Sequence, residues 1–202
     1  MSQETPDQLR QRMLDGALPR ERLQLADALG YAPAQQALER PDPPPPGAWD
    51  PPTGPITLEF WGRRLGRFGP AVMFRIATAL ARYSATQTEP HPALEEGLSV
   101  ADRFLARAEG ASGEGLAEAT ETAAKSVARA ALTLEGSPEG QACRTLLPVL
   151  RAILAVLEGG PPDRALLDSH YLRTLEQASA ADLSLDAVQA AIRVEVCAWA
   201  LG

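Results

Sequence analysis

The stretch "LLPVLRAILAVL", Leu146 to Leu157, is the longest apolar run in the chain. Its apolar side chains reach nearly every side of a helix, and such a helix belongs in the middle of a bundle. The run is interrupted by Arg151 and is too short to span a bilayer, so we expect no membrane partner. Ser137 and Pro138 predict the start of this helix, whereas Pro148 predicts either a kink or the true start.

Two amphipathic segments precede this run and predict a helical hairpin. They cover residues 93–108 and 115–134, and the second is rich in alanine. Small side chains let two helix backbones approach closely, so we expect the pair to pack as a tight antiparallel hairpin. Further helices are indicated before and after this pair. Their apolar stripes carry Val72, Met73, Ile76 and Leu80; Leu166, Leu167, Tyr171 and Leu172; and Val188, Ile192, Val196 and Trp199.

The composition also favours helices. Ala, Leu, Glu, Arg and Gln dominate, and aromatic residues make up only 5% of the 202 residues, which disfavours sheet. No repeat of fixed length indicates a regular solenoid. We therefore predict an all-α protein, an irregular multi-helix bundle of antiparallel helical hairpins, with its main domain at residues 57–202. Gly69 and Pro70 divide the start of this domain into two helices or kink a single one.

Residues 1–40 predict a small helical unit at the N-terminus. Three short helices are indicated: one capped by Thr5, a second from Pro19 to Gly30, and a third near Pro33. Helices this short bury little apolar area by themselves. We therefore expect the unit to dock on the main domain.

A proline-rich linker, residues 41–56, joins the unit to the main domain. Consecutive prolines favour polyproline II, so the linker is expected to be an extended and semi-rigid strap. Trp49 lies within it and gains most by packing against an apolar surface.

Charge constrains the partners of the protein. The formal net charge is −7, which argues against nucleic acid because binding to phosphates depends on Lys and Arg. One stretch is nevertheless basic, and it contains Arg63, Arg64, Arg67, Arg75 and Arg82. These arginines are either a patch for an acidic partner or ordinary residues on a solvated helix face. We predict protein contacts at these five arginines and at Trp49.

No arrangement of residues indicates catalysis, a metal site or a cofactor. A serine, histidine and aspartate triad at Asp168, Ser169 and His170 fails because adjacent helix residues project about 100° apart. Cys143 and Cys197 form no CxxC pair, which disfavours a zinc site or a disulfide framework. We predict no catalytic residue, metal or cofactor.

Glu195 lies close to the apolar stripe of the last helix. It is interpreted either as a buried acid paired with an arginine such as Arg151, or as an acid at the edge of the stripe with its head in water.

The segment "PRERLQLADALGYAPAQQAL", Pro19 to Leu38, resembles the "ERLxLAAxLGxxxAxxAL" unit of uncharacterised alanine-rich helical proteins of myxobacteria and planctomycetes. Trp61, the segment Ala71 to Tyr83, and Glu89 to Gly110 are similar to the parts that follow this unit there. Some of those proteins are labelled as immunity proteins. The resemblance covers residues 16–110, and His91 stands where those proteins usually have an arginine.

This resemblance implies a protein that binds and covers another protein, as immunity proteins and inhibitors do. The alternative is a structural or regulatory adaptor within a multi-protein assembly. An enzyme is the third reading, and no motif supports it. We expect a cytoplasmic protein, because the N-terminus lacks the apolar segment of a secretory signal. The identity of the partner and the formation of a homo-oligomer remain open.

Overall fold

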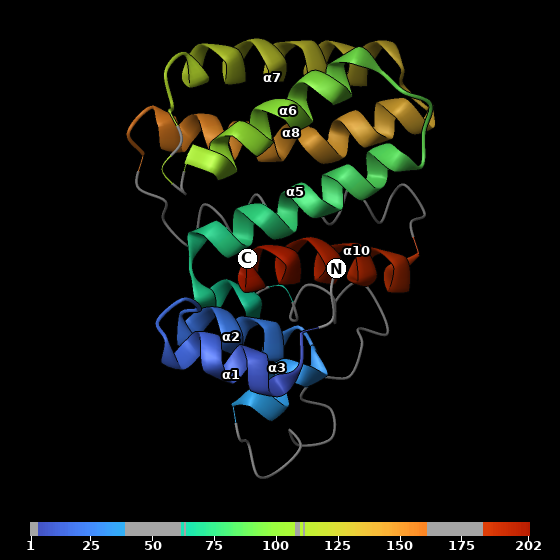
Figure 1. Cartoon of the computed structure of the whole chain (residues 1–202). Coiled ribbons are helices and arrows are strands. Elements are labelled where there is room, and N and C mark those ends of the chain that lie inside the picture. The colour runs from blue at the N-terminus through green and yellow to red at the C-terminus, as the bar shows by residue number, and fades with distance from the viewer. Residues whose placement is uncertain (1–3, 39–61, 63, 108–109, 111, 161–183) are drawn as a thin grey trace.

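The computed structural model describes residues 4–38, 62, 64–107, 110, 112–160 and 184–202. Within these ranges the chain forms eight α-helices, a short 3-10 helix and no strand, which confirms the all-α prediction (Figure 1). The helices are α1 (Pro6–Leu14), α2 (Arg20–Ala28), α3 (Ala32–Ala37), α5 (Pro70–Thr86), α6 (Pro92–Arg107), α7 (Leu116–Thr133), α8 (Pro138–Leu157) and α10 (Leu185–Leu201), with the 3-10 helix η1 (Gly66–Phe68) before α5.

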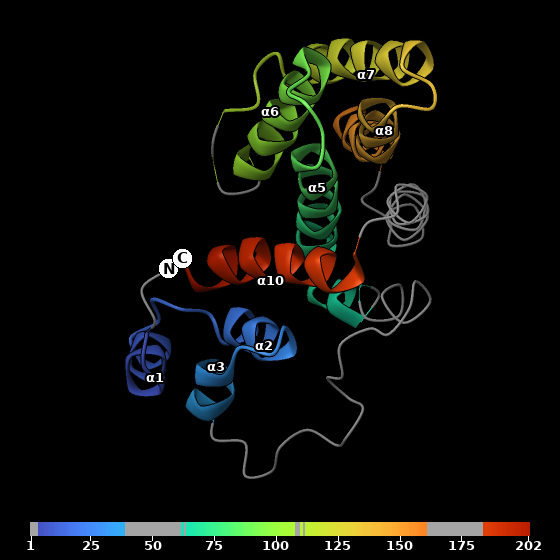
Figure 2. The same cartoon turned by 90° about the vertical axis from the view of Figure 1, so that its right-hand side faces the viewer.

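The helices are stacked in layers. Figure 1 shows α7 at the top, α6 and α8 beneath it, then α5, then α10, and finally α1 to α3. The view in Figure 2 shows that α5 connects the upper helices with α10, since it contacts α6, α8 and α10. Because α5 has neighbours on several sides, many of its residues are buried, and they extend from Val72 to Ser84. The main core therefore follows α5 from end to end.

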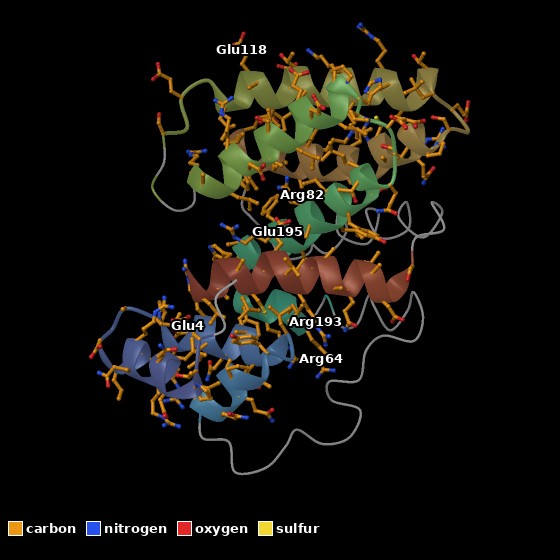
Figure 3. The ribbon with its side chains drawn as sticks, turned by 45° about the vertical axis from the view of Figure 1, so that its right-hand side comes forward. Glu4, Arg64, Arg82, Glu118, Arg193 and Glu195 are labelled. Atoms are coloured by element: carbon orange, nitrogen blue, oxygen red, sulfur yellow. The ribbon has the colours of Figure 1, made fainter. Side chains whose placement is uncertain are left out.

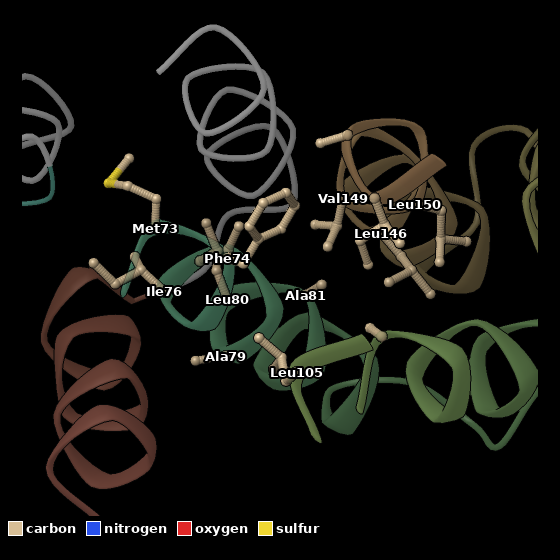
Figure 4. Close-up of a cluster of buried hydrophobic side chains, with 14 of the residues drawn as sticks. Met73, Phe74, Ile76, Ala79, Leu80, Ala81, Leu105, Leu146, Val149 and Leu150 are labelled. Carbon is tan, nitrogen blue, oxygen red and sulfur yellow. The ribbon is translucent and has the colours of Figure 1, made fainter. Parts of the chain in front are cut away.

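Helix α8 contains the long apolar run and packs against α5, α6 and α7, as its pattern predicts. Leu146, Val149 and Leu150 are buried beside α5 (Figure 4). Ser137 caps the helix by accepting a hydrogen bond from the Gly140 amide at 3.1 Å. The helix continues through Pro148, so this proline does not mark its start.

Helix α8 is longer than the apolar run that it contains. It has 20 residues, and an 18-residue window within it has a mean hydropathy of 1.4, so it is the one helix in the described ranges that could cross a membrane by length and composition. That finding is weak evidence of a span, because a core helix meets the same criterion and 56% of the apolar window is buried inside the protein. The expectation of no membrane partner, which was drawn from the shorter run, stays a prediction.

Helices α6 and α7 run in opposite directions and pack against each other (Figure 1). Both helices have buried alanines, among them Ala101 of α6 and Ala123 of α7, and Gly97 of α6 lies close to α7. A Cβ atom at Gly97 would lie 2.7 Å from Leu146 and 3.2 Å from Val127. A side chain at position 97 would therefore require Leu146 to shift, because α6, α7 and α8 pack closely at this place.

Gly69 separates η1 from α5. Its φ of 110° is a conformation that a residue with a side chain rarely adopts. Pro70 then begins α5, where its missing N–H is not needed. The two segments are consequently separate elements and not one kinked helix.

The N-terminal helices dock on α10, as expected from their small size. Leu201 of α10 joins their apolar cluster, which includes Leu9, Leu23 and Ala34. The Arg12 guanidinium donates a hydrogen bond to the Leu201 carbonyl at 2.6 Å. Conversely, three residues of the N-terminal helices belong to the main core, namely Leu25, Ala28 and Leu29. The two parts therefore share apolar residues in both directions.

Some predictions fall outside the described residues. They concern the linker at 41–56 with Trp49, and the helix expected after Asp163. The division into residues 1–40, 41–56 and 57–202 stays a prediction.

Candidate functional site

The arginines of the basic stretch do not gather on one face. Arg64 and Arg67 are exposed before α5, whereas Arg75 and Arg82 lie half-buried on α5, and Arg63 is outside the described residues. Arg75 and Arg82 are engaged with other parts of the chain. A role of these arginines or of Trp49 in binding a partner stays a prediction.

Arg75 stacks on Trp199 of α10, with its guanidinium carbon 4.4 Å from the ring centroid. Arg22 of α2 stacks on the same ring at 4.6 Å. An arginine over an aromatic face is attracted by the negative charge of the ring surface. Trp199 thus joins α2, α5 and α10, and Arg75 has a structural role here.

Arg82 is the centre of a small charged cluster on three helices. Its Nη2 lies 2.5 Å from Oδ1 of Asp102 on α6, and its Nε lies 3.3 Å from Oε2 of Glu195 on α10. Burial alone would lower the pKa of the Arg82 guanidinium. The hydrogen bond to Asp102 and the two negative charges outweigh burial, so the pKa is raised above its ordinary value. Figure 3 shows Arg82 and Glu195 between α5 and α10.

Glu195 is a largely buried acid with an arginine partner, and this partner is Arg82. Its side chain is 23% exposed, so Glu195 is largely buried and is paired, while it also borders the solvent. Arg151 is itself exposed and is not the partner. Burial raises the pKa of the Glu195 carboxyl, Asp102 adds to the effect, and the charges of Arg82 and Arg75 only partly offset it.

An open groove lies beside this cluster, between α5 and α10. Its volume is about 440 Å³. Ala79 and Tyr83 line it from α5, and Ala187, Ala190, Ala191 and Val194 line it from α10. Arg82 and Glu195 are at its rim. The lining is mainly carbon, and Val194 leaves 64% of its surface exposed.

The groove arises from a second apolar face of α10. One face, with Val188, Ile192 and Val196, is buried in the core. The alanines and Val194 form another face, which α5 covers only in part. The first face is predicted from the sequence, whereas the second was not. Apolar residues at positions 187, 190, 191 and 194 recur at helical spacing, and this spacing is the signal that could have revealed it.

The histidine and the cysteines that the structure describes do not form a reactive site. His91 Nδ1 accepts a hydrogen bond from the Ala93 amide at 3.2 Å at the start of α6. Cys143 and Cys197 are free and buried. Burial raises the pKa of each thiol to about 11, which makes both poor nucleophiles. His170 lies outside the described residues, and within the described ranges no group of three or more His, Cys, Asp or Glu is placed to hold a metal ion.

The fold and the groove define an all-α helical protein with an apolar hollow beside a charged cluster. Comparison with protein-family models, curated proteins and solved structures finds no match to this chain. The resemblance to alanine-rich helical proteins, some of them labelled as immunity proteins, therefore stays a prediction.

Proposed function

We propose that the protein is a non-catalytic binding protein that covers a partner protein, in the manner of an immunity protein or inhibitor. The observation that carries this proposal is the groove between α5 and α10. Apolar hollows open to solvent cost hydration free energy, and on protein surfaces they commonly mark interaction sites. The net charge of −7 adds to the argument, because an acidic protein associates faster with a basic partner.

The test is photo-crosslinking in the native cell. A photoreactive phenylalanine derivative replaces Val194 at the groove, and the matched control replaces Leu14, which is 71% exposed on α1. The proposal expects one discrete protein adduct from position 194 and none from position 14. The purified partner must then form a one-to-one complex with this protein. No adduct from either position would contradict the proposal.

The adaptor alternative has less support from the described surface. Besides Val194, the exposed large apolar residues there are Leu14 on α1 and Leu132 on α7, near opposite ends of the stack. Single exposed leucines are common on soluble proteins and indicate no surface of their own. Several different adducts from positions 14 and 194 would favour the adaptor.

A further inference from the structure

We propose that the groove between α5 and α10 receives a basic amphipathic helix of the partner. Its apolar side would lie over the alanines of α10, and a Lys or Arg would lie against Glu195 and Asp102. This inference rests on the proposed function and names the chemistry of the partner.

The shape of the groove favours a helix as its occupant. On α5 the lining residues include Ala79, Tyr83 and Thr86, and on α10 they include Ala187 and Val194, so each helix presents one continuous face. Side chains as small as alanine leave a depression into which the ridge of a third helix can pack. Amphipathic helices commonly bind in grooves between two helices through apolar residues three and four positions apart.

The charges at the rim favour a basic occupant. Arg82 carries one positive charge and faces two carboxylates, so the three ion-paired side chains of Arg82, Asp102 and Glu195 together carry one negative charge. Glu195 Oε1 and Asp102 Oδ2 have no hydrogen-bond partner among the described residues, and the Asp102 side chain is 51% exposed. The charge of Arg75, which is stacked on Trp199, also reaches Glu195 and offsets part of its negative charge. The negative charge at the rim therefore lies mainly at Asp102, the more exposed of the two carboxylates.

A cation from the partner would pair with the two free carboxylate oxygens. An acidic helix would meet the same oxygens as like charges and would be disfavoured. Asp186, which is exposed beside Ala187, adds one more negative charge near the α10 end of the groove. The groove therefore discriminates between helices of opposite charge.

The experiment uses the full chain and two synthetic helical peptides. Both have the same leucine and alanine face, and their polar faces carry either lysine or glutamate. Fluorescence anisotropy measures affinity at about 0.1 M salt, where exposed charges are only partly screened. We expect the lysine peptide to bind at least about tenfold more tightly than the glutamate peptide, which corresponds to about 1.4 kcal/mol. Amide chemical shifts should change along α5 and α10.

Variants locate the binding site. Ala190→Trp places a bulky ring in the groove and is expected to weaken binding of the lysine peptide at least about tenfold. Ala117→Trp, at an exposed alanine of α7, is the matched control and should leave affinity unchanged. Asp102→Asn removes a rim charge and should reduce the preference for lysine over glutamate. Melting curves establish that each variant is folded.

Equal affinity for the two peptides, or shift changes confined to other helices, would overturn the inference. So would an Ala190→Trp variant that binds as the wild type does. A crosslinked partner from position 194 combined with equal peptide affinities would overturn this inference alone. Absence of every crosslinked partner would overturn the proposed function, whatever the peptides show.

Discussion

The stacking of Arg22 on Trp199 offers a direct test of how the N-terminal unit is held. The perturbation is a double-mutant cycle with Arg22→Met, Trp199→Leu and the double variant. Methionine keeps the apolar stem of the arginine but removes its charge, and leucine keeps apolar bulk but removes the ring. The weak hydrogen bond from Arg22 Nη1 to the Trp199 carbonyl, at 3.4 Å, involves the backbone acceptor, which Trp199→Leu preserves. The coupling energy therefore reports mainly on the ring.

The geometry sets the expected magnitude. The guanidinium carbon is 4.6 Å from the ring centroid, within the roughly 6 Å at which such pairs attract each other. Both side chains are half-buried, and measured values range from about 0.5 kcal/mol at exposed sites to about 2 kcal/mol at desolvated ones. We expect a coupling energy of about 1 kcal/mol.

Urea denaturation of the four proteins supplies the four free energies of unfolding. Arg20→Met is the matched control, since Arg20 is an exposed arginine of the same helix, and it should show no coupling to Trp199→Leu. A cycle with Arg22 that gives a coupling energy indistinguishable from the control would refute the stacking. It would also show that the Arg22–Trp199 pair does not help to hold α2 against α10.

Three other predictions follow from the packing and the titration of buried groups. Gly97→Val should destabilise the protein by about 1–3 kcal/mol because its side chain has no room beside α7 and α8, whereas Ser99→Val on the exposed side of α6 should cost much less in the same urea titration. The pKa of Glu195 is raised above 4.5 in the folded protein, so ionisation opposes folding, and Glu195→Gln should gain stability relative to the wild type as pH rises through and above 4.5. A relative stability that falls over this range would show that the ion pair outweighs burial. The thiols of Cys143 and Cys197, with pKa values of about 11, should react with iodoacetamide at about pH 8 only after unfolding, and rapid labelling of the native protein would contradict their burial.

Local rules in the sequence determine where the described helices begin and end. Thr5 caps α1 by accepting a hydrogen bond from the Gln8 amide, and Ser137 caps α8 in the same way. Gly30 ends the second helix with a φ of 81°, and Gly69 ends η1. These helix ends can be predicted from the sequence because capping and left-handed turns involve residues only a few positions apart.

The charged cluster of Arg82, Asp102 and Glu195 could not be predicted from the sequence in the same way. Arg82 meets Glu195 across 113 positions of the sequence and Asp102 across 20. Glu195 is a candidate buried acid from the sequence, but the partner suggested for it, Arg151, is not the one it has, because spacing along a chain does not say which helix faces will meet. The choice of partner depends on how α5, α6 and α10 cross.

The sequence by itself determined the all-α class, several of the helix limits and the packing of the apolar run in α8 against other helices, since these follow from composition, capping and periodicity. Only the tertiary structure decided that the N-terminal unit shares its core with α10, and that Ala187, Ala190, Ala191 and Val194 line an open groove. The physical reason is that an apolar helix face is equally suited to burial and to a binding surface. Which of the two it becomes depends on the neighbour that covers it.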